Sequence, residues 1–115
     1  MIDVELVPQV AARFKALSDA GRLLLLATLQ RGEKSVGELA EAVGRSQPNV
    51  SQHLASLLRS GIVETRRQGN RAFYRIADPT VLRICDAVCD SLAAQGAQRK
   101  AAPSGKRRRR AGGDR

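Results

Sequence analysis

Positive charge and short polar side chains concentrate in residues 45–75, the stretch of this chain best suited to bind a polyanion. The stretch contains six arginines and one acid, Glu64, for a net charge of +5. Guanidinium groups hold phosphates, while carboxamide and hydroxyl groups hydrogen-bond base edges in the major groove of a duplex. Such polar side chains open the stretch at Ser46, Gln47, Asn49, Ser51 and Gln52. Polar groups beside a basic clamp predict double-stranded DNA as the partner.

The side-chain types also suggest individual roles. Carboxamides offer a paired donor and acceptor to adenine, and serine hydroxyls donate or accept at several bases. His53 is the only histidine, and we interpret it as a phosphate contact or a packed side chain rather than a metal ligand or catalytic base. A solvated surface is the plainer alternative, but the charge concentration favours DNA. The predicted contacts are Arg45, Ser46, Gln47, Asn49, Ser51, Gln52, His53, Arg66, Arg67, Arg71 and Arg75.

A second basic segment lies at the end of the chain. Residues 99–115 carry a net charge of +7, whereas residues 1–44 carry −1 and residues 76–98 carry −2. Glycine, alanine, proline and clustered like charges cannot form a core. We therefore predict a folded domain over residues 1–95 and a basic disordered tail over 96–115, which adds sequence-independent affinity for DNA.

Hydrophobic periodicity and capping signals predict the elements that position the contacts. A first amphipathic helix covers 3–17, and a second, capped by Ser18 or Asp19, runs through 21–29 and is apolar almost all round. Ser35 and Glu38 form a capping box that opens a short third helix. Later elements are a helix from the N-cap Ser46 to residue 60, strands over 62–67 and 71–76, and a last helix from 78–79 to 92.

The connection before Ser46 is the most telling spacing. Only Gly44 and Arg45 separate two helices there, which is helix-turn-helix spacing. Together with the hairpin it predicts a mainly α fold of five helices with a β-hairpin wing, a winged helix-turn-helix. In this fold the second helix of the motif enters the major groove and the wing lies along the adjacent backbone. The chain has the length for only a modest core, so pairing with a second copy would bury further apolar surface.

Motifs across residues 5–92 resemble the ArsR/SmtB family of bacterial repressors. The resemblance is carried by residues 17–19, 22–23, 36–40, 46–54, 61–63 and 71–76. It implies a homodimer paired through its first and last helices, an operator that we expect to be an inverted repeat, and release of DNA by an inducer. The chain has Asp19-Ala20-Gly21-Arg22 where the family more usually has Asp-Pro-Thr-Arg, which leaves the arginine in place.

The resemblance also implies an inducer, usually a metal or metalloid and sometimes a redox or sulfur species. No cysteine occurs at residues 33–38, where the arsenic-type site would lie, and no histidine follows His53 for the zinc-type site. Cys85 and Cys89, one helical turn apart, can present two thiolates to one soft ion. We predict them as the inducer site, with no ion needed for folding. Alternatives are apolar packing at the dimer seam, a thiol-redox or sulfur sensor, and an architectural DNA-binding protein without a ligand.

Other classes of protein fit poorly. We predict no enzymatic activity, because the usual catalytic groups are missing. The sequence has one histidine, no glycine-rich phosphate loop and no pair of carboxylates at a spacing that suggests a cleft. Three aromatic residues are few for a single-strand binder that stacks bases. No apolar run approaches the ~20 residues that cross a bilayer, and the acidic start is unlike a signal peptide. We therefore expect a cytoplasmic, nucleoid-associated bacterial protein with no membrane partner.

Overall fold

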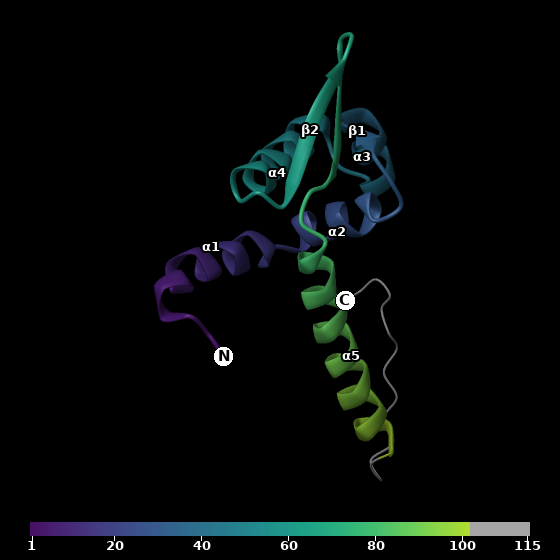
Figure 1. Cartoon of the computed structure of the whole chain (residues 1–115). Helices are drawn as coiled ribbons and strands as arrows, with labels where there is room; N and C mark the ends of the chain where they lie inside the picture. Colours follow the sequence, from purple (N-terminus) through teal and green to yellow (C-terminus); the bar gives the residue numbers. More distant parts are fainter. Residues whose placement is uncertain (102–115) are drawn as a thin grey trace. The chain divides into compact units, whose positions relative to one another are not determined.

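The structure is a computed structural model, and it describes residues 1–101. The chain divides into two compact units, Met1–Pro79 and the part that begins at Thr80. The elements along the chain are η1 (Val4–Leu6), α1 (Val7–Leu17), α2 (Ala20–Leu29), β1 (Lys34–Ser35), α3 (Val36–Val43), α4 (Gln47–Arg59), β2 (Val63–Gln68), β3 (Arg71–Ile76) and α5 (Thr80–Ala101) (Figure 1). The five predicted α-helices and the hairpin are confirmed.

The predicted first helix begins with a separate 3₁₀ turn. η1 is capped by Asp3, and Pro8 lies in the first turn of α1, where its missing N–H has no intrahelical partner to lose. Asp19, one of the two candidates, is the N-cap of α2 and accepts from the backbone N–H of Arg22 at 3.0 Å. Local chemistry thus sets the start of both helices.

The helix-turn-helix is held by the predicted caps. Glu38 N–H donates to Ser35 Oγ at 3.2 Å, and Ser35 N–H donates to Glu38 Oε1 at 2.8 Å, which completes the capping box. Gly44 ends α3 with φ 70°, a left-handed conformation that disfavours other residues. Two residues later Ser46 Oγ accepts from Asn49 N–H and starts α4.

The sheet has three antiparallel strands in the order β1-β3-β2. The hairpin of β2 and β3, residues 63–76, is the wing, and Figure 1 shows it extending past α3 and α4. Gly69, with φ 65°, leads its two-residue turn. The sequence did not predict β1, because a two-residue strand has no alternation to detect. β1 pairs Lys34 with Tyr74 and Ser35 with Phe73, so the wing is joined to the chain just before α3.

The core of the first unit lies among α2, α3, α4 and the base of the wing. Its fully buried side chains include Leu25, Leu26, Leu39, Val50, Leu54, Leu57 and Ile62. α2 is apolar almost all round, as predicted, but it is buried on one side only, because Leu23 and Leu24 are 40% and 48% exposed. A helix apolar on every side still turns only part of its circumference toward one small core.

The second unit is one long helix in the described residues. α5 runs from Thr80 to Ala101, so the predicted start of the tail at Gly96 falls inside the helix. Alanine, glutamine, arginine and lysine are good helix formers, and this local preference continues α5 past the last periodic apolar residue. The rest of the predicted tail, residues 102–115, lies outside the described residues.

Candidate nucleic-acid interface

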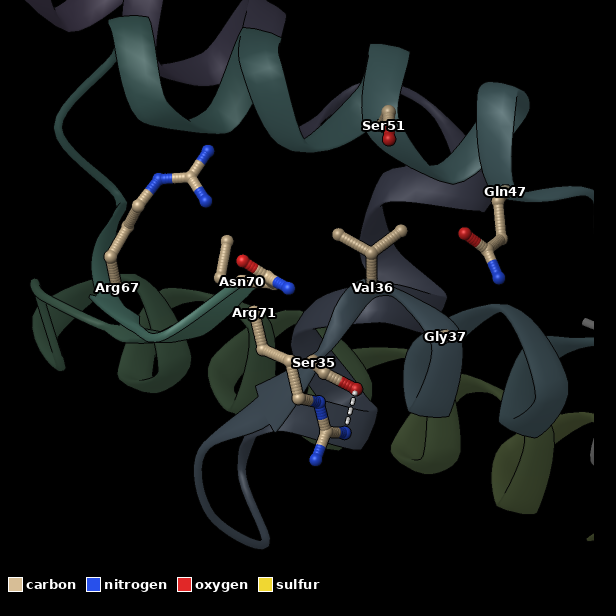
Figure 2. Close-up of a pocket in the computed structure, with 9 residues that line it drawn as sticks. Ser35, Val36, Gly37, Gln47, Ser51, Arg67, Asn70 and Arg71 are labelled. Atoms are coloured by element: carbon tan, nitrogen blue, oxygen red, sulfur yellow. Dashed lines mark hydrogen bonds between the residues drawn. The ribbon is translucent and has the colours of Figure 1, made fainter.

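An open recess lies between the start of α3, the first turns of α4 and the wing. Its volume is about 360 Å³, and its lining residues are Ser35, Val36, Gly37, Gln47, Ser51, Arg67, Asn70, Arg71 and Ala72. Figure 2 shows Gln47 and Ser51 of α4 on one side and Arg67 and Asn70 of the wing on the other. The structure therefore brings together four of the predicted contacts, Gln47, Ser51, Arg67 and Arg71, from positions up to 24 residues apart.

The recess is accessible because α4 divides into two faces. Val50, Leu54 and Leu57 are fully buried on one face and fix the rotation of the helix. Gln47 and Ser51 are four residues apart, so they lie one helical turn from each other on the opposite, exposed face. Gln52 is also exposed but does not line the recess. The exposed face of α4 thus offers carboxamide and hydroxyl groups to a ligand.

Two other predicted contacts at the start of α4 do not line the recess. Ser46 is used as the N-cap. Asn49 is half-buried, and its Oδ1 is buried without a hydrogen-bond partner among the described residues. An unmatched buried acceptor is uncommon, and it places the Asn49 oxygen away from the open recess.

Arg45 and His53 lie against the start of α2. The His53 side chain is 17% exposed, with Nε2 3.7 Å from Asp19 Oδ1 and Nδ1 3.5 Å from Arg22 Nη1. Of its two predicted roles, this geometry favours the packed side chain. The backbone N–H of Arg22 holds the pKa of Asp19 below its usual value, and electrostatic interactions with His53 and Arg22 act in the same direction.

Arg22 is a connecting residue that was not among the contacts predicted from the sequence. Its Nε donates to the carbonyl of Ala16 at 2.6 Å and its Nη2 to the carbonyl of Lys15 at 3.2 Å. Because the same guanidinium contacts His53, it joins the last turn of α1 to the middle of α4. Nothing in the local sequence distinguishes an arginine that joins two helices from an exposed one. The only sign was that Arg22 lies in a motif that resembles the family.

The four wing arginines fall on two faces of the hairpin. Strand register puts Arg66, Arg71 and Arg75 on one face, where they contact Glu33, Ser35 and Glu64 respectively. Arg67 pairs with Ala72 on the other face, and both line the recess, which Arg71 reaches from the first face. Arg67 has no hydrogen-bond or ion-pair partner in the described part of the chain. Arg67 is therefore the wing guanidinium most available to a phosphate.

The two cysteines lie one turn apart on α5. Cys85 is half-buried and Cys89 exposed, and both thiols are free. Burial raises the pKa of the Cys85 thiol, and the neighbouring Cys89 and Asp86 raise it further. Over the described residues, no group of three or more His, Cys, Asp and Glu side chains gathers closely enough to hold a metal ion. One chain therefore offers a soft pair of donors, fewer than the four of a tetrahedral site.

Comparisons with known proteins identify the family. The model of the bacterial regulatory protein arsR family matches residues 19–65. The biofilm growth-associated repressor of Xylella fastidiosa (strain 9a5c) is 43% identical over 90 residues, which are 78% of this chain and 79% of that protein. The chain belongs to the arsR family.

The chain is also similar to a solved structure and to a further relative. A homodimeric winged helix-turn-helix DNA-binding domain from Mycobacterium bovis, solved by NMR, is 35% identical with a TM-score of 0.71, over 86% of this chain and 91% of that one. A probable mercury resistance operon repressor of Streptomyces lividans is 45% identical over 75 residues, which are 64% of this chain and 60% of the relative. The predicted family and the winged helix-turn-helix fold are confirmed.

These arsR-family relatives are DNA-binding regulators of transcription, in line with the predicted repressor. None of the helices in residues 1–101 has both the length and the apolar character needed to span a membrane.

Proposed function

We propose that this arsR-family regulator represses transcription by binding an inverted-repeat operator as a homodimer. The observation that carries the proposal is the shared recess, where Gln47 and Ser51 of α4 face Arg67 of the wing. A helix entering the major groove would present the first two to base edges, while the wing guanidinium would meet the adjacent phosphate backbone. Two such surfaces in a two-fold dimer match two half-sites of an operator.

Exposed apolar surface supports the dimer. In the first unit Val7, Val10 and Phe14 of α1 are 43%, 38% and 51% exposed. On α5, Val88 and Leu92 are 53% and 61% exposed. A soluble monomer rarely exposes apolar side chains at helical spacing along a whole helix, and such stripes mark contact surfaces. We infer that a second copy covers them, as the resemblance implied for the first and last helices.

The inducer we propose is a thiophilic metal or metalloid ion bound by Cys85 and Cys89. Thiolates one turn apart on α5 suit a soft ion, and the corresponding pair from a second copy would raise the donors to four. The mercury resistance operon repressor among the relatives supports this class of inducer. Because the raised pKa keeps Cys85 protonated at neutral pH, binding must displace a proton and weakens on acidification.

DNA binding is tested by fluorescence anisotropy on the DNA upstream of the chain's own gene, with random duplex of equal length as reference. Gln47→Ala and Ser51→Ala should each weaken operator binding about tenfold or more, and binding to random DNA far less. Gln30→Ala, an exposed glutamine at the end of α2, is the matched control. Equal losses on both duplexes would reject the base-reading assignment, and a wild type without sequence preference would indicate an architectural protein.

The inducer is tested by adding soft metal ions, arsenite and oxidants to the preformed complex. Cys85→Ser with Cys89→Ser should leave a dimer that binds the operator and no longer responds to the ion. A response to oxidants or persulfide alone would favour the redox or sulfur alternative. If metal still releases the double variant from the operator as it releases the wild type, the two cysteines are packing residues.

A further inference from the structure

The wing has one face that is tied to the rest of its unit. Glu64, Arg66 and Gln68 of β2 pair with Arg75, Phe73 and Arg71 of β3, so these six side chains share a face. We call it the tied face. The neighbouring strand β1 pairs with β3 and leads directly into α3. Contacts between the tied face and the residues around β1 can therefore set the angle of the wing against the helix-turn-helix.

Arg66 makes the strongest of these contacts. Its Nε donates to Glu33 Oε2 at 2.8 Å and its Nη2 to Glu33 Oε1 at 2.7 Å, a bidentate pair with the residue just before β1. Its Nη1 donates to Gln68 Oε1 at 2.9 Å. All three nitrogens of the guanidinium are thus engaged, in a geometry more specific than that of a single ion pair. The Arg66 hydrogen bond lowers the pKa of Glu33, and Glu33 in turn raises the pKa of Arg66.

A second contact between the tied face and the residues around β1 involves Arg71, two residue pairs along the hairpin from Arg66. Arg71 Nη2 donates to Ser35 Oγ at 3.1 Å, and Ser35 is 5% exposed and caps α3. Figure 2 shows this bond, with the Arg71 side chain directed toward Ser35. The guanidinium carbons of Arg66 and Arg71 both lie 4.9 Å from the centre of the Phe73 ring, which holds the two arginines in place through cation–π contact.

We propose that Glu33 is a positioning residue for DNA binding: by holding Arg66 it fixes the wing so that Arg67, on the opposite face, meets a phosphate. The proposal rests on the proposed function, in which the wing lies along the DNA backbone. It gives an acidic side chain a favourable effect on DNA affinity. Charge alone would predict the opposite effect of Glu33 on DNA affinity, because removing a carboxylate near a polyanion strengthens binding.

The test measures Glu33→Gln on the operator and on random duplex. The tie is partly exposed to solvent, with 26% and 47% of the Glu33 and Arg66 side chains exposed, so the expected effect is moderate. Affinity should fall about two- to fivefold on both duplexes, because a displaced wing loses a backbone contact. Glu41→Gln removes the same charge from an exposed residue of α3 and should bind DNA as tightly as the wild type or more tightly.

Hydrogen exchange of the free protein supplies a readout that a charge effect would not change. In Glu33→Gln the amides of β2 and β3 should exchange faster, while those of the buried α4 face keep their protection. The reversed pair, Glu33→Arg with Arg66→Glu, leaves net charge unchanged and should recover part of the lost affinity and protection. Unchanged wing exchange, or binding as tight as that of the wild type, overturns the proposal.

Failure of the proposed function would look different. A wild type that does not prefer its operator would reject the sequence-specific repressor. The comparison of variants on random duplex and the exchange measurement would still decide whether Glu33 positions the wing.

Discussion

Gly21 and Arg45 approach so closely that a Cβ on Gly21 would lie 2.5 Å from Arg45 Nη1. The same Cβ would lie 2.9 Å from His53 Nε2 and 3.1 Å from Asp19 Oδ1. Gly21 stands where the family more usually has the Thr of Asp-Pro-Thr-Arg. In this chain the space that a side chain would take there is filled by groups from α4 and from the turn before it. Gly21 is buried, and the packing of those groups depends on its lack of a side chain.

Gly21→Ala should therefore destabilise the protein although alanine is the better helix former. The intrinsic gain is up to about 1 kcal/mol, whereas crowding a packed site costs about 1–3 kcal/mol. Arg45 is flexible and can move, but His53 is held by Asp19 and Arg22, so we expect a net loss near 1 kcal/mol. Urea denaturation measures it. Gly96→Ala, with no atom within 4 Å of the new Cβ, is the control and should be neutral or stabilising.

Stability should fall in acid, because three capping or paired carboxyls have lowered pKa values in the folded state. Asp19 and Glu38 accept backbone N–H groups at helix starts, and Glu33 is held by Arg66. A lowered folded pKa contributes stability that is present above the unfolded value, 3.8 for Asp19 and 4.5 for the two glutamates, and lost as pH falls through the folded value. The free energy of unfolding should therefore decline below about pH 4.

Asp19→Ala isolates the contribution of one carboxyl to this loss of stability in acid. It removes the N-cap of α2 and should cost about 1 kcal/mol at pH 7. The difference from the wild type should be smaller at pH 3, which is below the unfolded pKa of 3.8, because the unfolded state then takes up a proton and the charged cap stabilises the fold less. Denaturation at both pH values checks this. A difference that is the same at pH 7 and pH 3 would mean that the charge of Asp19 contributes nothing.

Arg67 and Arg75 provide a matched pair for counting phosphate contacts. Arg67 is unpaired within the described residues and lines the recess, whereas Arg75 is paired with Glu64. Arg67→Ala should reduce the slope of log affinity against log salt by about 0.9, the value of one duplex phosphate contact, on operator and random DNA alike. Arg75→Ala removes the same charge and should change the slope less. Equal slopes for the two variants would contradict the assignment of Arg67, rather than the paired Arg75, to a phosphate contact.

The proposed dimer predicts that a charge in the exposed apolar stripe yields monomers. Leu92→Arg and Phe14→Arg each place a guanidinium on a helix that we infer to be covered by the second copy. Sedimentation should show a monomer, and operator affinity should fall because two linked half-sites bind far more tightly than one. A monomeric wild type would remove the basis of this prediction.

The starts of α3 and α4 and the turn of the wing could be predicted because their causes are local. The capping box of Ser35 and Glu38, the N-cap Ser46 and the turn at Gly69 each depend on residues within one turn of the chain. The same patterns predicted the helix-turn-helix spacing and the charge of the wing, and hence the class of partner.

The division of labour among the arginines depended on tertiary structure. Arg66 and Arg67 are adjacent and chemically identical, yet one is held by Glu33, 33 residues earlier, and the other faces the recess. Likewise, Leu24 and Leu25 are neighbours in one apolar run, but only Leu25 is buried. Sequence alone determined which side chains were available and how each short segment folds. Which of them became packed, paired or open to DNA was decided by contacts between segments distant in the chain, and local preference does not encode those contacts.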